Sequence, residues 1–197
     1  MVNDTNEPLL ILILGPPCAG KTTLAKKLAA DLEIPQIGKD EIKELLFNHI
    51  NIGSREWSKK LGGASIELLY WAIEKFLLSR SDLIVDIDFG NPSNASNRLS
   101  EIRMKHFFQL LQINLVTEGD ILYSRFKERS LTGKRHPGHR DHENFEEFKP
   151  TLLKGKRETL NLQGSSIEID TTDFEAIDYK EVLDIIRSQK SQQSTND

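Results

Sequence analysis

Eight residues near the start of the chain have the types and spacing of a phosphate-binding loop. They read Gly15-Pro16-Pro17-Cys18-Ala19-Gly20-Lys21-Thr22, which fits the pattern G-x-x-x-x-G-K-[ST]. A glycine near each end permits backbone conformations that a side chain would forbid, so several N–H groups can turn inward around an anion. The following helix would add the positive end of its dipole. The alternative is a Gly/Pro turn that matches the pattern by chance.

The polar residues of this loop have predicted tasks in binding Mg-ATP. Lys21 would bridge the β- and γ-phosphates, and the hydroxyl of Thr22 would bind Mg2+. The other loop residues predicted to contact the nucleotide are Gly15, Cys18, Ala19, Gly20 and Thr23. We interpret Cys18 as a small filler at the tip of the loop, and the alternative is a thiol whose oxidation would block ATP.

A second arm of the magnesium site is predicted at the end of an apolar run. Leu83-Ile84-Val85-Asp86 places an acid directly after three apolar residues, where Asp86 could hold a Mg2+-bound water. Asp88 lies two residues further along and points to the same side of a strand, so it could serve instead. We favour Asp86. The alternative is that both acids only cap the end of the strand.

Phosphoryl transfer also needs a group that accepts the proton of the acceptor. Asp40 follows a short predicted strand and starts a helix, a position that lies beside the nucleotide cleft in sheets of this kind. There it could accept the proton of a substrate hydroxyl. The alternative is a plain helix N-cap. Lys43, one turn later, could touch an acidic substrate or be solvated.

Cationic side chains gather in the second half of the chain. Arg125 and Arg129 are four residues apart and share one helix face, and Arg135 and Arg140 follow in a Gly- and Pro-punctuated loop. Guanidinium groups match phosphate oxygens, so we predict a lid at about residues 132–142 that closes over ATP. The alternatives are a solvated basic loop paired with nearby Glu residues, or a metal site formed by His136, His139 and His142.

Strands alternate with helices around these motifs, which predicts a parallel sheet covered on both faces. The predicted strands are Leu9–Leu14, Ile34–Gly38, Leu83–Phe89, Phe108–Val116 and Ser166–Asp170. The predicted helices are Lys21–Leu32, one beginning at Asp40, Ala64–Leu78, Ser96–His106, Gly119–Leu131, Asn144–Leu162 with Pro150 as a break or kink, and Tyr179–Arg187. Residues 51–63 are polar and contain glycine. We predict a single domain over residues 9–187, with tails at 1–8 and 188–197.

Length and composition narrow the class of protein. The 197 residues include 26 Lys+Arg and 30 Asp+Glu, a net charge of −4, and 38% are hydrophobic, as in an ordinary soluble domain. Six apolar residues at 9–14 form the longest apolar run, too short to span a bilayer. The single Cys18 and an acidic start without Lys or Arg favour the cytoplasm. The net acidity argues against a general nucleic-acid coat.

The switch GTPases are a poor match. They read guanine with Asn-Lys-x-Asp after a strand, and here the strand ending at Val116 is followed by Thr117-Glu118-Gly119-Asp120. A large motor ATPase usually needs a longer chain. A small phosphotransferase fits the remaining features.

Five features recur in the order of a known group: the phosphate loop, Asp40-Glu41-Ile42-Lys43, the strand ending at Asp86, the helix with Arg125 and Arg129, and the loop Arg135-His136-Pro137-Gly138-His139. Over roughly residues 9–172 the chain resembles the small P-loop kinases known as predicted kinases or AAA-type ATP-binding proteins. That group is similar to zeta toxins, chloramphenicol phosphotransferase, gluconate kinase and the kinase domain of polynucleotide kinase.

The resemblance implies a three-layer α/β P-loop fold with a five-stranded parallel sheet in the order 2-3-1-4-5, a lid, and Mg-ATP as donor. It implies that Asp40 is the acceptor-side base and that Arg129 and Arg135 contact phosphates. Polynucleotide kinases usually carry Arg three residues after the base, whereas this chain has Lys43. The acceptor pocket is expected in the insert at about 48–70.

Our hypothesis is a kinase that transfers the γ-phosphoryl group of Mg-ATP to a hydroxyl of a small or nucleotide-like acceptor, working as a monomer or homodimer without membrane contact. One alternative is an ATP-binding regulatory module or ATPase that phosphorylates no acceptor. The other is a 5′-hydroxyl polynucleotide kinase.

Overall fold

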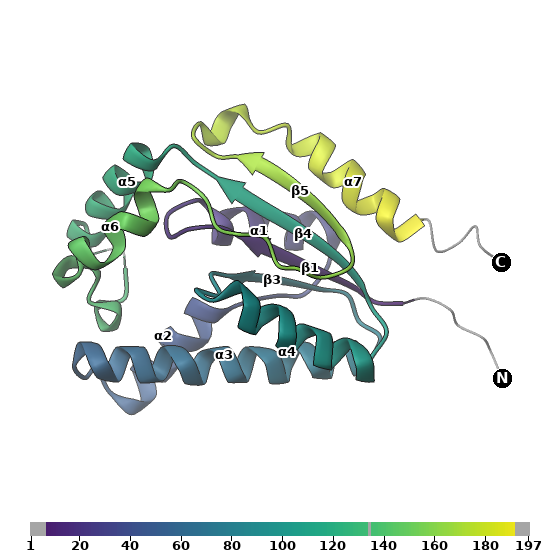
Figure 1. Ribbon diagram of the computed structural model, residues 1–197, viewed down its shortest axis with the longest axis horizontal. Coiled ribbons are helices and arrows are strands. Elements are labelled where there is room, and N and C mark those ends of the chain that lie inside the picture. Colours follow the sequence, from purple (N-terminus) through teal and green to yellow (C-terminus); the bar gives the residue numbers. More distant parts are fainter. Residues whose placement is uncertain (1–6, 134, 192–197) are drawn as a thin grey trace.

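The computed structural model describes residues 7–133 and 135–191, in which five strands form one parallel sheet (Figure 1). The order across the sheet is β2-β3-β1-β4-β5, as the resemblance implied, so the predicted fold class is confirmed. The strands are β1 (Leu9–Leu14), β2 (Gln36–Gly38), β3 (Leu83–Ile87), β4 (Gln109–Val116) and β5 (Ser165–Asp170).

The helices follow the strands in alternation. They are α1 (Lys21–Leu32), α2 (Lys39–Ile50), α3 (Arg55–Leu78), α4 (Pro92–Lys105), α5 (Gly119–Leu131), α6 (Phe145–Leu153) and α7 (Tyr179–Ser191). Three short 3-10 turns complete the described elements: η1 (Pro137–His139), η2 (Asp141–Glu143) and η3 (Phe174–Ala176).

Strand β1 divides the hydrophobic core into two layers because successive side chains of a strand point to opposite faces. Its odd-numbered residues, such as Ile11, pack with side chains of α1, α5, α6 and α7. Its even-numbered residues, such as Leu12, pack with side chains of α3 and α4. All six residues of β1 are buried, which explains why a continuous apolar run rather than an alternating pattern encodes this strand.

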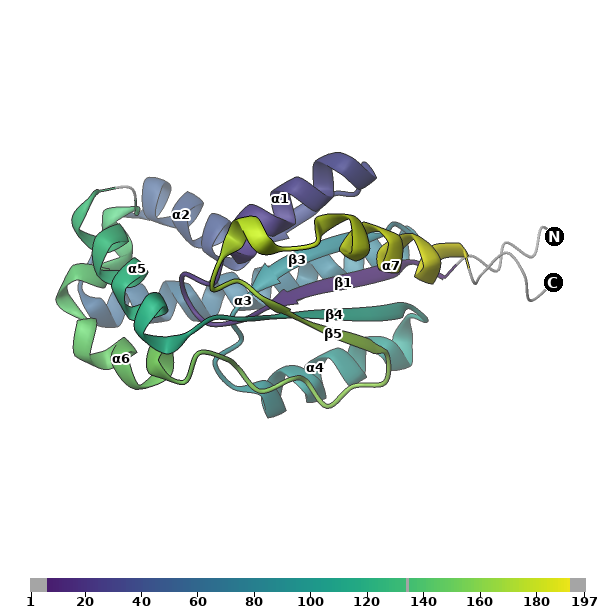
Figure 2. The same ribbon diagram turned by 90° about the horizontal axis from the view of Figure 1, so that it is seen from above.

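The helices therefore lie on both faces of the sheet. Figure 2 shows α1 and α7 above the sheet and α4 below it, while α5 and α6 lie beyond the end to which the strands point. That end is the carboxyl edge of a parallel sheet, where open α/β folds bind their ligands.

The pairing register places three chain segments side by side at this edge. Ile13 of β1 pairs with Asp86 of β3, and Asp86 pairs with Gly38 of β2. A Cβ on Gly38 would lie 2.1 Å from Oδ1 of Asp86, so only glycine lets β2 approach this carboxylate so closely.

Two predictions about helix starts are wrong. Gly38, not Asp40, is the N-cap of α2, so Asp40 lies in the first turn, where a carboxylate interacts favourably with the helix dipole. Helix α3 begins at Arg55, so most of the polar segment 51–63 is helical. The Ser54 side chain accepts a hydrogen bond from the Trp57 N–H and caps this helix.

The remaining differences lie at element ends. Helix α4 starts at Pro92, where Asn91 caps it, and β3 ends at Ile87 rather than Phe89. Helix α6 includes Pro150 but ends at Leu153. Residues 154–162, which we predicted to be helical, are therefore outside the helix. Helix α7 continues to Ser191, past residue 188, where we predicted the C-terminal tail to start. The rest of that tail and residues 1–6 lie outside the described residues. Within residues 7–133 and 135–191, no helix carries an apolar stretch that could traverse a bilayer.

The two-layer core predicts a large cost for a cavity in β1. Leu12→Ala should lower the free energy of unfolding by about 2–5 kcal/mol, because Leu12 is fully buried between the sheet and α3/α4. Leu131→Ala, which removes the same atoms from a side chain that is 75% exposed, should change it by less than about 0.5 kcal/mol. Urea denaturation measures both, and equal effects would contradict the assignment of this core.

Candidate active site

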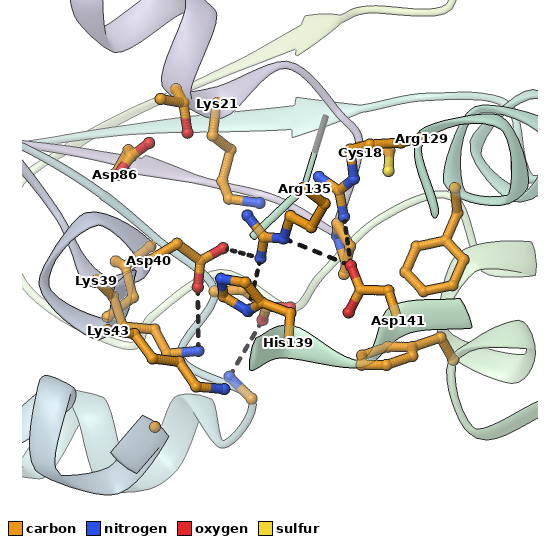
Figure 3. A pocket seen from close by; sticks show the side chains of 18 of the residues that line it. Cys18, Lys21, Lys39, Asp40, Lys43, Asp86, Arg129, Arg135, His139 and Asp141 are labelled. Carbon is orange, nitrogen blue, oxygen red and sulfur yellow. Dashed lines mark hydrogen bonds and ion pairs between the residues drawn. The ribbon is translucent and has the colours of Figure 1, made fainter. Parts of the chain in front are cut away.

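A cavity of about 700 Å³ opens at the carboxyl edge of the sheet (Figure 3). It is bordered by the loop after β1, the start of α2, the middle of α3, the end of β3, the helix α5 and the segment that follows α5. Segments that lie far apart between Pro17 and Phe148 thus meet at one place, and most of the residues singled out in the sequence line this cavity.

The phosphate-binding loop has the conformation that its glycines permit. Gly15 and Gly20 have φ angles of +148° and +88°, and Cys18, with φ +68°, lies at a tight turn between them. A Cβ on Gly15 would lie 2.8 Å from the carbonyl oxygen of Leu115. The loop is therefore pressed between β4 and the start of α1, with the N-terminus of α1 directed at the cavity.

Burial shifts the pKa of Lys21 and that of Cys18 away from their ordinary values. Lys21 Nζ donates to the carbonyl oxygens of Gly15 at 2.9 Å and Pro16 at 2.8 Å, and burial lowers its pKa. An ammonium group held only by neutral oxygens is suited to an incoming anion. Burial raises the pKa of the Cys18 thiol, which keeps it protonated and does not favour the alternative of a reactive thiolate.

The structure brings together the two residues predicted to support magnesium. Asp86 is 5% exposed, and it accepts a hydrogen bond from Thr22. Burial raises its pKa, and the Thr22 hydroxyl and the charge of Lys21 only partly offset this effect. Asp88 instead forms an ion pair with Arg157. One carboxylate and one hydroxyl fit Mg2+, which usually takes its other ligands from water and phosphates.

Asp40 meets the lid segment through Arg135. The guanidinium Nη2 of Arg135 donates to Oδ2 of Asp40 at 2.6 Å, and Lys39 Nζ lies 3.5 Å from Oδ1. Burial among protein atoms tends to raise the pKa of Asp40, but the charges of Arg135, Lys39 and His139 outweigh it and hold this pKa far below its usual range. Asp40 is thus a carboxylate at every ordinary pH. In Figure 3, Lys21, Asp40 and Arg135 point toward one another.

Arg135 is the centre of a larger network. Its Nε lies 3.4 Å from Oδ2 of Asp141, and its Nη2 donates to Nδ1 of His139. His139 in turn donates from Nε2 to Glu44 at 3.0 Å, and burial lowers its pKa, so it acts as a neutral link. Asp141, only 7% exposed, also pairs with Arg129 at 3.3 Å. Asp141 was missed in the sequence analysis, because in the sequence it is one more acid in a polar loop.

The two arginines of α5 have different partners. Arg125 donates from Nη1 and Nη2 to the carbonyl oxygens of Thr171 and Thr172 after β5, at 2.9 and 2.8 Å. Arg129 faces Asp141. The Nε atoms of Arg129 and Arg135 are buried and make no hydrogen bond among the described residues, although Arg135 Nε faces Asp141 at 3.4 Å.

Comparison with known proteins identifies the group. The family model described as "AAA domain" matches residues 10–152, which is most of the chain. The chain belongs to this AAA domain family. A candidate kinase from Chloroflexus aurantiacus is 31% identical and superposes with a TM-score of 0.84, covering 95% of this chain and 98% of that one. The resemblance to small P-loop kinases that the motifs indicated is therefore confirmed.

More distant kinases share the fold. A gluconokinase from Sinorhizobium meliloti is 14% identical with a TM-score of 0.52, covering 97% of this chain and 95% of that one. A sugar kinase from Janibacter sp. HTCC2649 is 13% identical with a TM-score of 0.51, covering 92% and 91%. No curated protein sequence matches the chain. This member of the AAA domain family thus has a kinase-like P-loop fold.

In this AAA domain protein the predicted lid lies against α2. The ring of Phe47 stacks on His136 at 5.3 Å between ring centres and meets His139 edge-on at 5.6 Å. His136, His139 and His142 contact Asn48, Glu44 and Glu143 respectively, three separate partners. Within the described residues, no group of three or more His, Cys, Asp or Glu side chains could hold a metal. Lys134, which belongs to the predicted basic loop, lies outside the described residues.

The insert at about 48–70, which we predicted to form the acceptor pocket, contributes one face of α3 to the cavity. Arg55, Lys59, Gly62, Gly63 and Ile66 line it, whereas Trp57 and Lys60 do not. The alternative of a basic loop paired with Glu residues applies in part, because Arg140 pairs with Glu143 at 2.8 Å. Arg135 instead turns into the cavity.

Packing of the predicted lid against α2 requires the glycine at position 138. A Cβ there would lie 2.5 Å from the Phe47 ring, which His136 and His139 hold in place. Gly138→Ala should therefore cost about 1–3 kcal/mol of lid docking. Amide exchange at residues 137–142 should accelerate roughly tenfold or more.

Gly63→Ala is the control, since no atom lies within 4 Å of its added Cβ. Exchange in the lid should be unaffected by it. Equal lid exchange in Gly138→Ala and wild-type protein would mean that the lid does not depend on this contact.

Proposed function

We propose that this protein is a kinase that transfers the γ-phosphoryl group of Mg-ATP to a hydroxyl of a small-molecule acceptor. The observation that carries the proposal is the convergence of Lys21, Asp40 and Arg135 on one cavity. These residues come from the start of α1, the first turn of α2 and the segment after α5, which lie far apart in the sequence. The 31% identical relative with the same fold is also a candidate kinase.

On the nucleotide side, Gly15, Cys18, Ala19 and Gly20 would direct backbone N–H groups at the phosphates, as would Thr23 in the first turn of α1. Lys21 would leave the carbonyl oxygens of its own loop for the β- and γ-phosphates. Thr22 and Asp86 would hold Mg2+, which neutralises charge on the phosphates when bound. Arg125 and Arg129 would complete the nucleotide site.

On the acceptor side, Asp40 would orient the hydroxyl and accept its proton. Its low pKa makes it a weak base, which suits a loose transition state, where the nucleophile loses its proton late. The γ-phosphate would compete with Asp40 for the Arg135 guanidinium. Arrival of ATP would thereby free the carboxylate for the hydroxyl and place a cation on the group in transfer.

The cavity favours a small acceptor over a polynucleotide. Its volume of about 700 Å³ lies in the range of small-molecule sites, roughly 300–1,000 Å³. Most of its cations already have carboxylate partners, including Arg55 and Lys59 with Glu147. A polynucleotide site needs a free basic surface.

Two substitutions separate donor binding from transfer. Lys21→Ala should abolish tight ATP binding, because it removes the cation at the β- and γ-phosphates. Asp40→Asn should retain ATP binding but lower the transfer rate by about 10²–10⁴-fold, because the amide cannot take a proton. Calorimetric titration of ATP and a labelled-ATP screen across hydroxylated metabolites measure the two effects.

Asp184→Asn on α7 is the matched control, since this carboxylate is 60% exposed and lies outside the cavity. It should leave both ATP binding and transfer unchanged. Full transfer activity in Asp40→Asn would refute the assigned base. Label found only in free phosphate across the whole screen would favour the ATPase or regulatory alternative.

A further inference from the structure

Lys43 is a buried cation on the acceptor side of the cavity. It lies on α2 one turn after Asp40 and is only 5% exposed, yet it lines the cavity. Its Nζ donates to Oγ of Ser58 on α3 at 3.0 Å and lies 5.3 Å from the centre of the Phe47 ring. An ammonium group has three N–H donors, so this hydroxyl satisfies only one of them.

The neighbouring cations all have carboxylate partners. Lys39 lies 3.5 Å from Asp40, and Arg55 and Lys59 lie 2.9 and 3.1 Å from Glu147. Among the residues that the structure describes, no carboxylate lies within 4 Å of Lys43 Nζ. A buried charge without a counterion is costly, so a protein that keeps one usually has a use for it.

Lys21 shows what such a lysine can do in the same cavity. It too is held only by neutral oxygens, and burial lowers the pKa of both lysines, that of Lys43 to about 8. Lys21 lies where a phosphate is expected. The similar surroundings of Lys43 indicate a second position for negative charge.

Space beside the ammonium is available for such a group. Two consecutive glycines of α3, Gly62 and Gly63, line the cavity, although glycine in a helix interior costs about 1 kcal/mol each. A Cβ on Gly62 would lie 3.7 Å from Lys43 Nζ, and a Cβ on Gly63 would meet no atom within 4 Å. A larger side chain at position 62 would fill the room next to Lys43, and Gly63 leaves further open space in the same cavity.

We propose that the acceptor is an anion whose carboxylate or phosphate binds Lys43, a few bonds from the hydroxyl that faces Asp40. This inference rests on the proposed kinase function, because it assigns the acceptor of that reaction. The short separation is supported by the i, i+3 spacing, which puts the Cβ atoms about 5–6 Å apart on one helix face, and by the charge of Asp40, which acts on the Lys43 ammonium. A compact hydroxy acid or a phosphorylated polyol has this arrangement, whereas neutral sugars and nucleosides lack the charge.

The test compares matched pairs of acceptors. Labelled phosphoryl transfer is measured for hydroxylated metabolites paired with neutral counterparts, including gluconate with glucose and glycerol 3-phosphate with glycerol. Transfer confined to anionic members supports the proposal, and the active pair tells a carboxylate from a phosphate. Transfer to neutral members at equal rates overturns the anionic acceptor but leaves the kinase intact. Absence of transfer to every member would count against the kinase.

The affinity for the anion can be measured without phosphoryl transfer. The enzyme is saturated with Mg2+ and a non-hydrolysable ATP analogue, and the anionic members are titrated by calorimetry. Lys43→Met should weaken their binding about 10- to 100-fold, as expected for a lost charge-assisted hydrogen bond, while analogue binding is retained. Equal affinity in the variant, or no anion binding to the wild-type enzyme, overturns the proposal.

Two further measurements guard against a folding defect. Lys60→Met is the matched control on α3, because Lys60 is 66% exposed, pairs with Glu56 and lies outside the cavity. In wild-type protein, anion affinity should fall as pH rises from 7 to 9, since Lys43, with a pKa of about 8, loses its proton over that range. The loss at pH 9 should be roughly tenfold. Constant affinity over this range would exclude Lys43 as the anion's partner.

Discussion

The parallel register of β2, β3 and β1 is the constraint on which the site depends. Gly38, Asp86 and Ile13 are aligned across the three strands, so the segments that follow these strands all leave the sheet at the same edge. The phosphate loop therefore starts next to Asp86, and α2 starts next to both. Residues as far apart in sequence as Thr22, Asp40 and Asp86 become neighbours without any long connecting structure. A side chain at Gly38 would separate β2 from Asp86 and displace the start of α2.

Features encoded by local sequence were predictable. Buried strands appear as continuous apolar runs, and the phosphate loop is specified by glycines whose positive φ angles no other residue adopts easily. The start of α3 was missed because Arg55–Gly63 is polar and ends in two glycines, although Ser54 before it is a recognisable cap. The end of α6 was also missed, although Gly155, which follows the C-cap Lys154 with a positive φ of 72°, is a recognisable stop signal.

The electrostatic state of the site was beyond prediction because it depends on pairings over long sequence separations. Asp40 and Arg135 are 95 positions apart, and both were identified, but nothing in the sequence showed that they bind each other. The same holds for Asp141, whose role becomes visible only when Arg129 and Arg135 flank it. The roles assigned to these residues stay predictions, while their convergence is an observation.

The cavity contains cations with a carboxylate partner and cations without one, and the latter indicate where the negative charge of a ligand would bind. Five cations of the cavity form ion pairs with three shared carboxylates, so binding an anion there requires an exchange of partners: Lys39 and Arg135 with Asp40, Arg55 and Lys59 with Glu147, and Arg129 with Asp141. Among the described residues that line the cavity, Lys21, Arg125 and Lys43 have only neutral oxygens within hydrogen-bonding distance. Two of these three cations lie on the nucleotide side and the third beside Asp40. The net charge of −4 therefore conceals a cavity whose unpaired cations extend from the phosphate loop to the neighbourhood of Asp40. A kinase needs this pattern, because free cations attract both substrates while paired ones remain available for the charge that moves during transfer.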